Sequence, residues 1–489
     1  MRHDTIAANT GTMFLASGTA TLLDYFRVPY EVDTELGSRG LEQLRRGPDG
    51  PSLFWATTLT GDTKAAKISG RNGQPEVPIF ARTVPDARVP GLLSEVGRGW
   101  RPVRTLIEED GRPGGAIWQS EDGSIFLPFD PGEVMVNYWS ERYAGIGERG
   151  RVRRVRRLMM MGYYRLRPFL PRQLQIWLRR QFARQQARSS FPRWPIETGL
   201  HDFYDLMFAI LADVAGEPIP RIASWPDRYE WALVLTHDVE KAQGLAALEP
   251  VLEAERANGF RSCWNLVAGD YEVPLERVRT LVDDGFEVGV HGMHHDGRDF
   301  ESRAIWQERL PGIREAGERW GAVGFRAPSL HRRWEWMPQL GFDYDSSCPD
   351  ADPFEPQDGG CCTWLPFFNG ELVELPLTLT LDHTLFVILC QTDERAWVAK
   401  AEFLRDRGGM ALIDTHPDYL VDGTILSSYA SFLARFASDA TAWKALPREV
   451  SAWWRRRAAS SLRREGEVWR IVGPAADEGR VELVEGGAW

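Results

Sequence analysis

The sequence lacks any long uninterrupted apolar stretch. Hydrophobic residues make up 43% and charged residues 26% of its 489 positions, which is typical of a soluble globular protein. No run approaches the roughly 20 apolar residues that a membrane-spanning helix needs. The N-terminal residues also lack a basic region followed by an apolar core and a small-residue cleavage site, so no secretory signal is expected. We therefore expect a cytoplasmic protein of two or three domains.

Cysteine is scarce and shows no pattern. The five cysteines are an odd number, and none lies in the CxxC spacing of a zinc knuckle or a redox pair. We therefore expect buried, reduced thiols. No internal repeat or low-complexity segment is present.

Acidic residues are missing from residues 149–193, which contain 14 arginines. Because the whole chain carries −11, the remainder carries about −25. Leu174, Trp177, Leu178 and Phe182 have the spacing of one face of an amphipathic helix. We expect these arginines to cover a domain junction, since prolines interrupt the run. The alternative is peripheral contact with an anionic membrane at the inner membrane surface; no nucleic-acid partner is expected.

Composition along the chain predicts four regions. Residues 1–145 mix short apolar runs with Gly, Pro and Asp, which favours an α/β or mainly β accessory domain. Residues 146–227 form an arginine-rich helical connector. Residues 228–440 alternate short apolar strands with helical segments, the pattern of a parallel α/β architecture. Residues 441–489 predict a C-terminal helix over 448–462 and a hairpin of VWRIV with RVELV.

Within the third region we expect helices at 245–257 and 275–283, each followed by a glycine that ends it. Seven strands are expected, at 232–236, 262–267, 286–290, 323–326, 342–345, 372–375 and 410–414.

Polar side chains follow several of these strands directly. Asp238, His291, Arg326 and His416 each stand at a strand end. Because the ends of parallel strands face one side of a barrel, reactive groups gather there. The pattern therefore predicts one shared site.

Two clusters carry the chemistry of this site. Asp238 and Glu240 are two residues apart, so in extended backbone both carboxylates point to one face. His291 and His295 are four apart, a spacing that lets two imidazoles meet on one helical turn. Two histidines and one carboxylate suit a zinc-like ion with positions left open for water and substrate, so a hydrolytic site is indicated. His294 cannot share that face and is left outside the site.

Four motifs in order, Asp238-Val239-Glu240, His291-x-x-x-His295, Arg326-Ala327-Pro328 and Thr415-His416-Pro417, resemble the polysaccharide deacetylase family, the NodB homology domain. The resemblance covers roughly residues 228–440. It implies a distorted (β/α)7 barrel and one divalent metal ion held by Glu240, His291 and His295. Zinc is the usual metal, and cobalt, nickel and manganese are alternatives.

The resemblance also implies roles for the remaining motif residues. Asp238 would be the general base toward a water molecule, and Arg326 would orient it and keep it ionised. His416 would be the general acid that protonates the leaving amine, with Asp414 as a neighbour able to keep it charged. The separated acids, the glutamate at position 240 and the glycine at position 292 depart from the family's usual pattern.

Residues near the expected site mouth are candidates for binding substrate. They are Asp345, Trp364 and the pair Asp382 and His383, of which Trp364 offers a face for stacking a sugar ring. The leading hypothesis is a hydrolase that removes N-acetyl or O-acyl groups from a saccharide or glycan precursor, in surface or exopolysaccharide metabolism. The alternatives are a hydrolase of a small linear or cyclic amide, and a non-catalytic carbohydrate-binding relative with a decayed metal site.

Overall fold

The computed structural model divides the chain into two compact units that are each assembled from separate stretches of sequence. The first contains residues 1–154, 198–223 and 456–489, and the second contains residues 155–197 and 224–455. The expected boundaries at 145, 227 and 440 treat the domains as consecutive, whereas residues 198–223 and 456–489 cluster with the N-terminal region. The residues that the structure describes are 13–16, 20–33, 35–36, 40–46, 50–57, 59–70, 75–146, 171, 174, 177, 179–181, 183, 186, 191–487 and 489.

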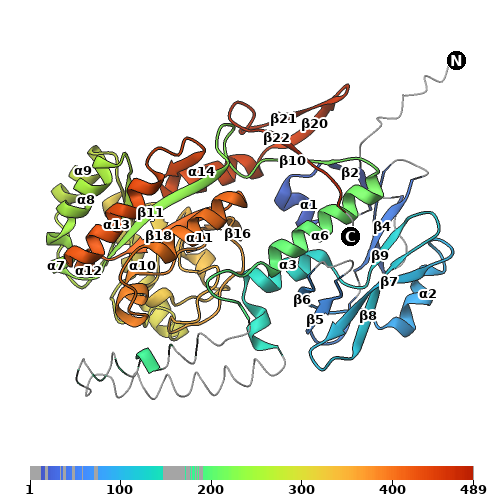
Figure 1. Ribbon diagram of the computed structural model, residues 1–489, viewed down its shortest axis with the longest axis horizontal. Coiled ribbons are helices and arrows are strands. Elements are labelled where there is room, and N and C mark those ends of the chain that lie inside the picture. The colour runs from blue at the N-terminus through green and yellow to red at the C-terminus, as the bar shows by residue number, and fades with distance from the viewer. Residues whose placement is uncertain are drawn as a thin grey trace. The chain divides into compact units, whose positions relative to one another are not determined.

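The first unit is built on a mixed nine-stranded sheet of order β2-β1-β3-β4-β9-β8-β7-β5-β6 (Figure 1). Helix α6 packs on this sheet, and the ring of Phe26 meets Tyr204 and Phe208 of that helix edge-on. Its strands are β1 Met13–Leu15, β2 Tyr30–Val32, β3 Leu41–Arg46, β4 Ser52–Ala56, β5 Lys64–Ile68, β6 Val77–Ala81, β7 Arg101–Glu108, β8 Pro113–Gln119 and β9 Ile125–Leu127. Its helices are α1 Thr21–Phe26, α2 Val89–Leu93, α3 Pro131–Trp139 and α6 Gly199–Ala215.

The C-terminal strands pair differently from the expected hairpin. Strand β21 (Val468–Val472) pairs with β20 (Ser461–Glu465), and β22 (Val481–Val484) pairs with β10 (Ile219–Ile222). The prediction that VWRIV pairs with RVELV is therefore wrong. The tight turn that makes the hairpin is Gly466-Glu467, where Gly466 has a φ of 65°, a conformation that glycine adopts readily.

The second unit contains the parallel α/β sheet that the sequence predicts. Its strand order is β16-β17-β15-β14-β13-β12-β11-β18, with β19 pairing β11, and only the β16–β17 pair is antiparallel. All nine residues of β11 are buried, as expected for a central parallel strand covered on both faces. The strands are β11 Trp231–Val239, β12 Ser262–Leu266, β13 Glu287–Val290, β14 Gly324–Phe325, β15 Tyr344–Asp345, β16 Phe367–Asn369, β17 Leu372–Glu374, β18 Met410–Thr415 and β19 Ala442–Ala445.

Helices connect these strands. The expected helix over 245–257 is in fact two, α7 and α8, separated at Ala247. The helices are α7 Ala242–Ala246, α8 Leu248–Ala257, α9 Leu275–Asp283, α10 Arg303–Trp320, α11 Arg395–Asp406, α12 Pro417–Leu420, α13 Gly423–Phe436 and α14 Pro447–Ala458, together with the π-helix η6 His383–Ile388.

The sheet of the second unit is a half-barrel; the distorted (β/α)7 barrel that the resemblance implies stays a prediction. Beyond β18 the wall continues as irregular chain, in which Thr378 and Leu379 donate main-chain bonds of 3.3 and 3.0 Å to the carbonyl of Leu412. This segment contacts β18 without forming a regular strand.

Most of the arginine-rich segment lies outside the described residues. Those that are described include helical residues that pack within the second unit. Arg180 donates to the carbonyl of Val387 at 2.9 and 3.1 Å, and Ala183 packs against Phe354 and Ile388. Among the described residues, no helix is long and apolar enough to cross a membrane.

Candidate active site

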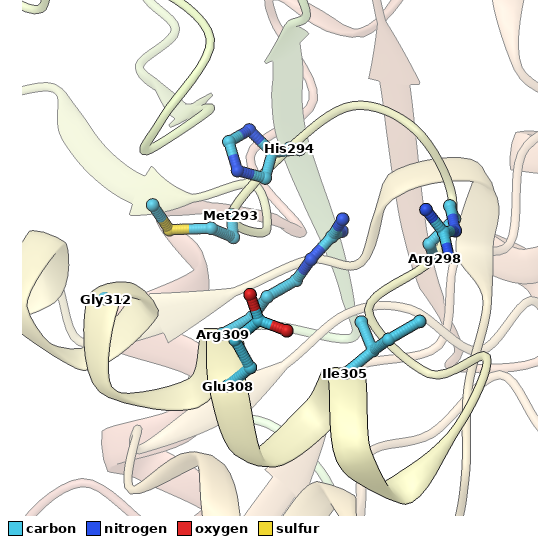
Figure 2. A pocket seen from close by; sticks show the side chains of 7 residues that line it. All are labelled: Met293, His294, Arg298, Ile305, Glu308, Arg309 and Gly312. Atoms are coloured by element: carbon cyan, nitrogen blue, oxygen red, sulfur yellow. The ribbon is translucent and has the colours of Figure 1, made fainter.

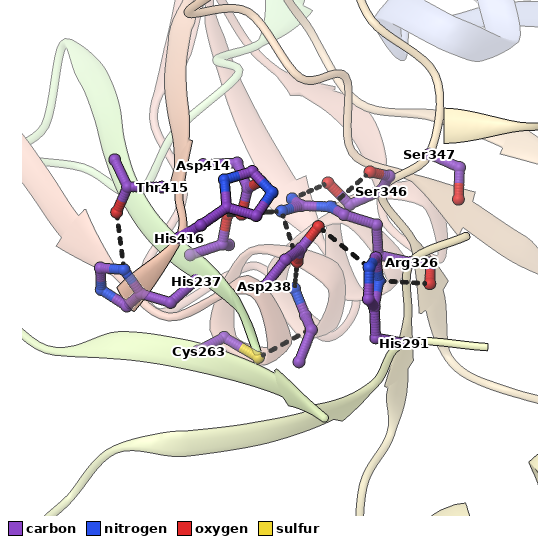
Figure 3. A network of polar contacts seen from close by, with 12 residues as sticks. His237, Asp238, Cys263, His291, Arg326, Ser346, Ser347, Asp414, Thr415 and His416 are labelled. Atoms are coloured by element: carbon purple, nitrogen blue, oxygen red, sulfur yellow. Dashed lines mark hydrogen bonds and ion pairs between the residues drawn. The ribbon is translucent and has the colours of Figure 1, made fainter. Parts of the chain in front are cut away.

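The structure brings together the polar residues at four strand ends of the second unit. Asp238 is the penultimate residue of β11, while His291, Arg326 and His416 directly follow β13, β14 and β18. Figure 3 shows their side chains converging, with Asp238 between Arg326 and His291. Convergence follows from the parallel arrangement, because all these strands end on the same edge of the sheet.

Asp238 is a buried carboxylate at the centre of the site. Its Oδ1 accepts hydrogen bonds from Asn265 Nδ2 at 2.8 Å and Arg326 Nη1 at 3.3 Å. Its Oδ2 lies 3.6 Å from Nε2 of His291. Burial favours the neutral acid, but His291, Arg326 and His416 outweigh it and lower the pKa of Asp238 to about 2. Asp238 is therefore ionised at neutral pH.

Arg326 holds two strand ends together from a fully buried position. Its Nη1 donates to Asp414 Oδ1, to Thr236 Oγ1 at 2.8 Å and to Asp238. Its Nε and Nη2 donate to the carbonyl and hydroxyl of Ser346 at 2.9 and 2.8 Å. Burial alone would lower the pKa of Arg326, but Asp414 and Asp238 raise it. The expected partner, Asp238, is the more distant of its two carboxylates.

His291 presents an unpaired nitrogen lone pair inside the protein. Its Nδ1 lies 3.1 Å from the carbonyl of Arg326, so Nδ1 carries the proton and donates it. Burial lowers the pKa of His291 to about 4, despite the opposing effect of Asp238, so the ring is neutral at pH 7. Its Nε2 is buried without a hydrogen-bond partner and faces the Asp238 carboxylate. Two acceptors face one another, an arrangement that a cation between them would stabilise.

Glu240 and His295 form the outer part of the site. Oε1 of Glu240 lies 3.0 Å from Nε2 of His295 and 3.5 Å from Nε2 of His416. Burial would raise the pKa of Glu240, but the hydrogen bond from His295 and the charge on His416 lower it, so this group is also a carboxylate. The rings of His291 and His295 have centroids 5.4 Å apart.

His291 and His295 do not lie on a helical turn, so that part of the prediction is wrong. They belong to a loop, and the backbone of Gly292 has a φ of 68°. A Cβ at this position would lie 2.4 Å from Asp299 Oδ2 and 2.6 Å from Pro328 Cδ. Glycine is therefore required here by both conformation and space.

His416 has the opposite protonation state from His291. Its Nδ1 donates to Asp382 Oδ1 at 2.7 Å, and its main-chain N–H donates to Asp382 Oδ2 at 2.7 Å. Burial alone would lower the pKa of His416, but Asp382 outweighs it, and Asp414 and Glu240 act in the same direction, so the pKa is raised well above its usual value. We therefore assign a protonated ring whose Nε2 points toward Glu240 and Asp414, at 3.5 and 3.9 Å.

One group of three metal-type ligand atoms within 4.8 Å of one another occurs among the described residues, and it consists of Asp238, Asp414 and His416. This group is a poor fit for a cation. Arg326 already donates to both carboxylates, and His416 carries a proton on the nitrogen that would have to ligate. A divalent ion there would be repelled by the positive charges of Arg326 and His416.

Glu240, His291 and His295 are a better match in donor chemistry, with Asp238 close by. They offer a carboxylate, a neutral imidazole with a free buried lone pair, and a second imidazole beside the carboxylate. This is the donor set that zinc and its neighbours favour. The residues present therefore fit a divalent ion at this position better than at the Asp238-Asp414-His416 group.

Asp382 is the functional residue that the sequence reasoning underrated. It was considered only for the site mouth, and Asp414 was expected to keep His416 charged. The structure assigns that role first to Asp382, which is fully buried and caps η6 through the N–H of His383. The signal available in the sequence is an aspartate just before an apolar run at residues 385–388.

His237 is a buried histidine on the opposite face of β11. Its Nδ1 lies 2.8 Å from Thr415 Oγ1 and its Nε2 lies 2.7 Å from Glu255 Oε1, and the ring stacks on Trp264 with centroids 4.2 Å apart. Figure 3 shows the His237–Thr415 pair directed away from Asp238. Alternation along the strand places His237 behind the site.

The two residues expected to bind substrate are both enclosed. Trp364 is 2% exposed and its ring packs edge-on against Phe403. Asp345 is fully buried and accepts from the hydroxyl of Ser347, which in turn accepts from the N–H of Ala327. Neither placement offers a surface to a sugar, because the Trp364 ring is packed inside the protein and Asp345 supports the loop after Arg326.

An open cavity of about 300 Å³ lies next to the histidine loop (Figure 2). Met293 and His294 form one wall, and α10 forms the other. Nδ1 of His294 lies 2.7 Å from Asp270 Oδ1, and this side chain is 40% exposed, so it lies outside the site as expected.

No protein-family model matches the chain, and no curated protein matches it. Several solved structures are similar to about half of it. One, assigned as a polysaccharide deacetylase from Mycobacterium smegmatis, shares 20% identity at a TM-score of 0.40, covering 50% of this chain and 98% of its own. The Puue allantoinase shares 17% identity at a TM-score of 0.40, covering 54% of this chain and 98% of its own.

A third solved structure is a CE4 family pseudoenzyme from Bacillus anthracis. It shares 13% identity at a TM-score of 0.31, covering 46% of this chain and 68% of its own. The solved structures that this chain is similar to thus include polysaccharide deacetylases and family 4 carbohydrate esterases, as the four motifs indicated. The likeness is distant, so the roles of the side chains rest on the geometry of this chain.

Proposed function

We propose that this protein is a metal-dependent hydrolase that removes N-acetyl or O-acyl groups from a saccharide. The observation that carries the proposal is the buried, unpaired Nε2 of His291, which faces the Asp238 carboxylate beside the Glu240–His295 pair. A buried acceptor without a donor costs stability, roughly 1–3 kcal/mol, and functional sites are where such a cost persists. A bound cation removes it.

Glu240, His291 and His295 would hold one divalent ion, with zinc favoured and cobalt, nickel or manganese as alternatives. Such an ion acidifies a water molecule and polarises an acyl oxygen, so that even a weakly basic carboxylate suffices as proton acceptor. Asp238 is in the ionised state that a proton acceptor needs. Its low pKa keeps it ionised, and Asn265 and Arg326 fix its orientation through Oδ1, leaving Oδ2 directed at the site.

His416 would supply the proton that the leaving amine or alcohol requires. An amide nitrogen leaves poorly as an anion, so its proton must arrive as the carbon–nitrogen bond breaks. Asp382 holds the ring by Nδ1 and keeps it charged, which leaves the Nε2 proton free to transfer. Water adds to the acyl carbon, the amine departs with the proton from His416, and Asp238 holds the proton taken from water.

The substrate panel tests both the reaction and its scope. Acetate release would be measured from N-acetylated and O-acetylated saccharides and from small linear and cyclic amides, with and without a chelator. We expect release that the chelator abolishes, that Zn²⁺ or Co²⁺ restores, and that Asp238→Asn lacks. Turnover that persists in chelator would contradict the mechanism. Faster turnover of the small amides than of the saccharides would make a small amide the proposed substrate.

A non-catalytic carbohydrate-binding relative is the second candidate. One observation favours it: the Glu240 carboxylate is already in contact with ring nitrogens of His295 at 3.0 Å and of His416 at 3.5 Å. Metal content of the purified protein separates the two, since the hydrolase should hold one equivalent and the binding protein none.

The setting we propose is the synthesis of a surface polysaccharide or exopolysaccharide, with a glycan precursor met at an anionic membrane through residues 149–193. Among the described residues of this segment, Trp177 is 55% exposed and Leu174 is 40% exposed, as an interfacial helix requires. Sedimentation with anionic and neutral liposomes tests this. Equal binding to both would remove the membrane from the proposal.

A further inference from the structure

Residues 268–271, which we name the clasp, lie in the loop between β12 and α9 and contact both loops that carry the proposed ligands. On one side the main-chain N–H groups of Ala268 and Gly269 donate to the carbonyls of Gly292 and Met293 at 3.2 and 2.8 Å. These bonds extend the β12–β13 pairing beyond the ends of the strands. The clasp therefore runs beside the histidine loop.

Asp270 fixes the position of the second histidine. Its Oδ2 accepts from the main-chain N–H of His295 at 2.7 Å, and its Oδ1 lies 2.7 Å from Nδ1 of His294. Close contact leaves no room for a side chain at the preceding position, because a Cβ on Gly269 would lie 2.8 Å from His294 Cε1 and 2.9 Å from the carbonyl of Met293. One carboxylate thus holds the backbone that carries His295.

Tyr271 fixes the chain that carries the two acids. Its hydroxyl donates to the carbonyl of Val239 at 2.5 Å and accepts from the N–H of Val267 at 3.3 Å. Val239 pairs with Leu266 at the end of the β11–β12 ladder. The hydroxyl links the carbonyl of Val239 to the N–H of Val267, just beyond this last pair. It therefore fixes the point at which the chain leaves the sheet, between Asp238 and Glu240.

We propose that the clasp sets the distance between Glu240 and His295 and thereby the affinity of the site for a divalent ion. The inference rests on the proposed function, and it names Asp270 and Tyr271 as positioning residues. Neither needs to touch the ion. The side chain of Glu240 has three rotatable bonds, so a fixed backbone on both sides limits the positions that its carboxylate can take.

The test measures metal binding directly. Wild type, Tyr271→Phe and Asp270→Asn would be titrated with Zn²⁺ and Co²⁺ against a chromophoric chelator, and the visible spectrum of bound Co²⁺ recorded. We expect each variant to bind about 10–100-fold more weakly, with altered Co²⁺ absorption, the size of effect seen when supporting groups around metal ligands are removed. Activity of both variants should recover with excess Zn²⁺, which a loss of fold would not allow.

Matched controls lose the same chemical groups away from the site. Tyr138→Phe removes a hydroxyl that donates to the carbonyl of Pro78 at 2.6 Å, and Asp393→Asn alters an exposed acid that accepts a main-chain N–H at 3.2 Å. Both controls should bind Co²⁺ as wild type does. If both clasp variants show wild-type affinity and a wild-type spectrum, the role proposed for the clasp is refuted and the proposed function is unaffected. A wild-type protein that binds neither ion would overturn the proposed function and the clasp with it.

Discussion

His291 and His416 are both buried at strand ends of the same sheet, yet the structure assigns them opposite protonation states. Each ring is bonded through Nδ1, His291 to the carbonyl of Arg326 and His416 to the carboxyl group of Asp382. A carbonyl orients the ring but adds no charge, so burial dominates and lowers the pKa of His291 to about 4. The Asp382 carboxylate outweighs burial and raises the pKa of His416. The group bonded to Nδ1, more than burial, therefore decides whether the ring is neutral, as a metal ligand must be, or charged, as a proton donor must be.

Asp382→Asn should give the largest effect, because it removes the charge that distinguishes His416 from His291. We expect kcat to fall by about 10²–10³-fold, within the range of general acid catalysis. Without that carboxylate the pKa of His416 falls, so activity should be lost at a lower pH as the pH rises. Rate profiles from pH 5 to 10 would measure this, and an unchanged alkaline limb would refute the role of Asp382. Asp393→Asn is the control for the amide substitution.

His291→Ala removes the neutral partner of the comparison. Bound Zn²⁺ should be lost on dialysis, with affinity reduced about 100-fold or more, since one of three ligands is gone. Metal analysis of dialysed protein gives the readout, and Asp393→Asn, which alters an acid outside the site, is the control. Stoichiometric zinc in the His291 variant would show that the ion is held elsewhere, for example by Asp238, Asp414 and His416.

Burial lowers the pKa of the His291 imidazole and should raise the pKa of a carboxyl group. Glu287 tests this second effect. Burial raises the pKa of Glu287 to about 7 from an ordinary 4.5, although Arg448 N–H and the Tyr344 hydroxyl bond it. The folded state then binds the proton more tightly, so its stability is full below pH 4.5 and falls as the pH rises through 7.

We therefore expect wild type to lose on the order of 1–3 kcal/mol between pH 5 and pH 8 through Glu287. Glu287→Gln should lack that part of the slope, because the amide does not titrate in this pH range. Denaturant unfolding at the two pH values measures the difference. Parallel slopes for the two proteins would contradict the prediction.

His237→Phe should have the smallest effect on activity, because both ring nitrogens are engaged on the far face of β11. We expect kcat within about threefold of wild type and a loss of about 1–3 kcal/mol in stability, since Glu255 loses one buried donor. Thermal unfolding and steady-state rates would check both. A large fall in kcat with normal stability would extend the site to this face.

The sequence was sufficient for seven strands of the second unit and for the polar residues at their ends, because apolar runs followed by polar residues are a local pattern. It was insufficient where long-range packing decides. Asp382 reaches His416 across 34 positions of chain, and no periodicity marks that pairing. The loop at Gly292 replaced a helical turn because Asp299 and, from a later part of the chain, Pro328 close around it. The pairing of β22 with β10 joins residues more than 250 positions apart.

Strand β11 pairs with β18 so that Thr236 stands opposite Asp414 and His237 opposite Thr415. Side chains alternate between the two faces, so a shift of one residue would send the acids into the core and bring His237 and Thr415 to the reactive edge. The buried His237–Thr415 and Thr236–Asp414 bonds can form only in the observed alignment. These two hydrogen bonds help to fix the register, so the alignment of the reactive edge depends on contacts on both faces of the sheet.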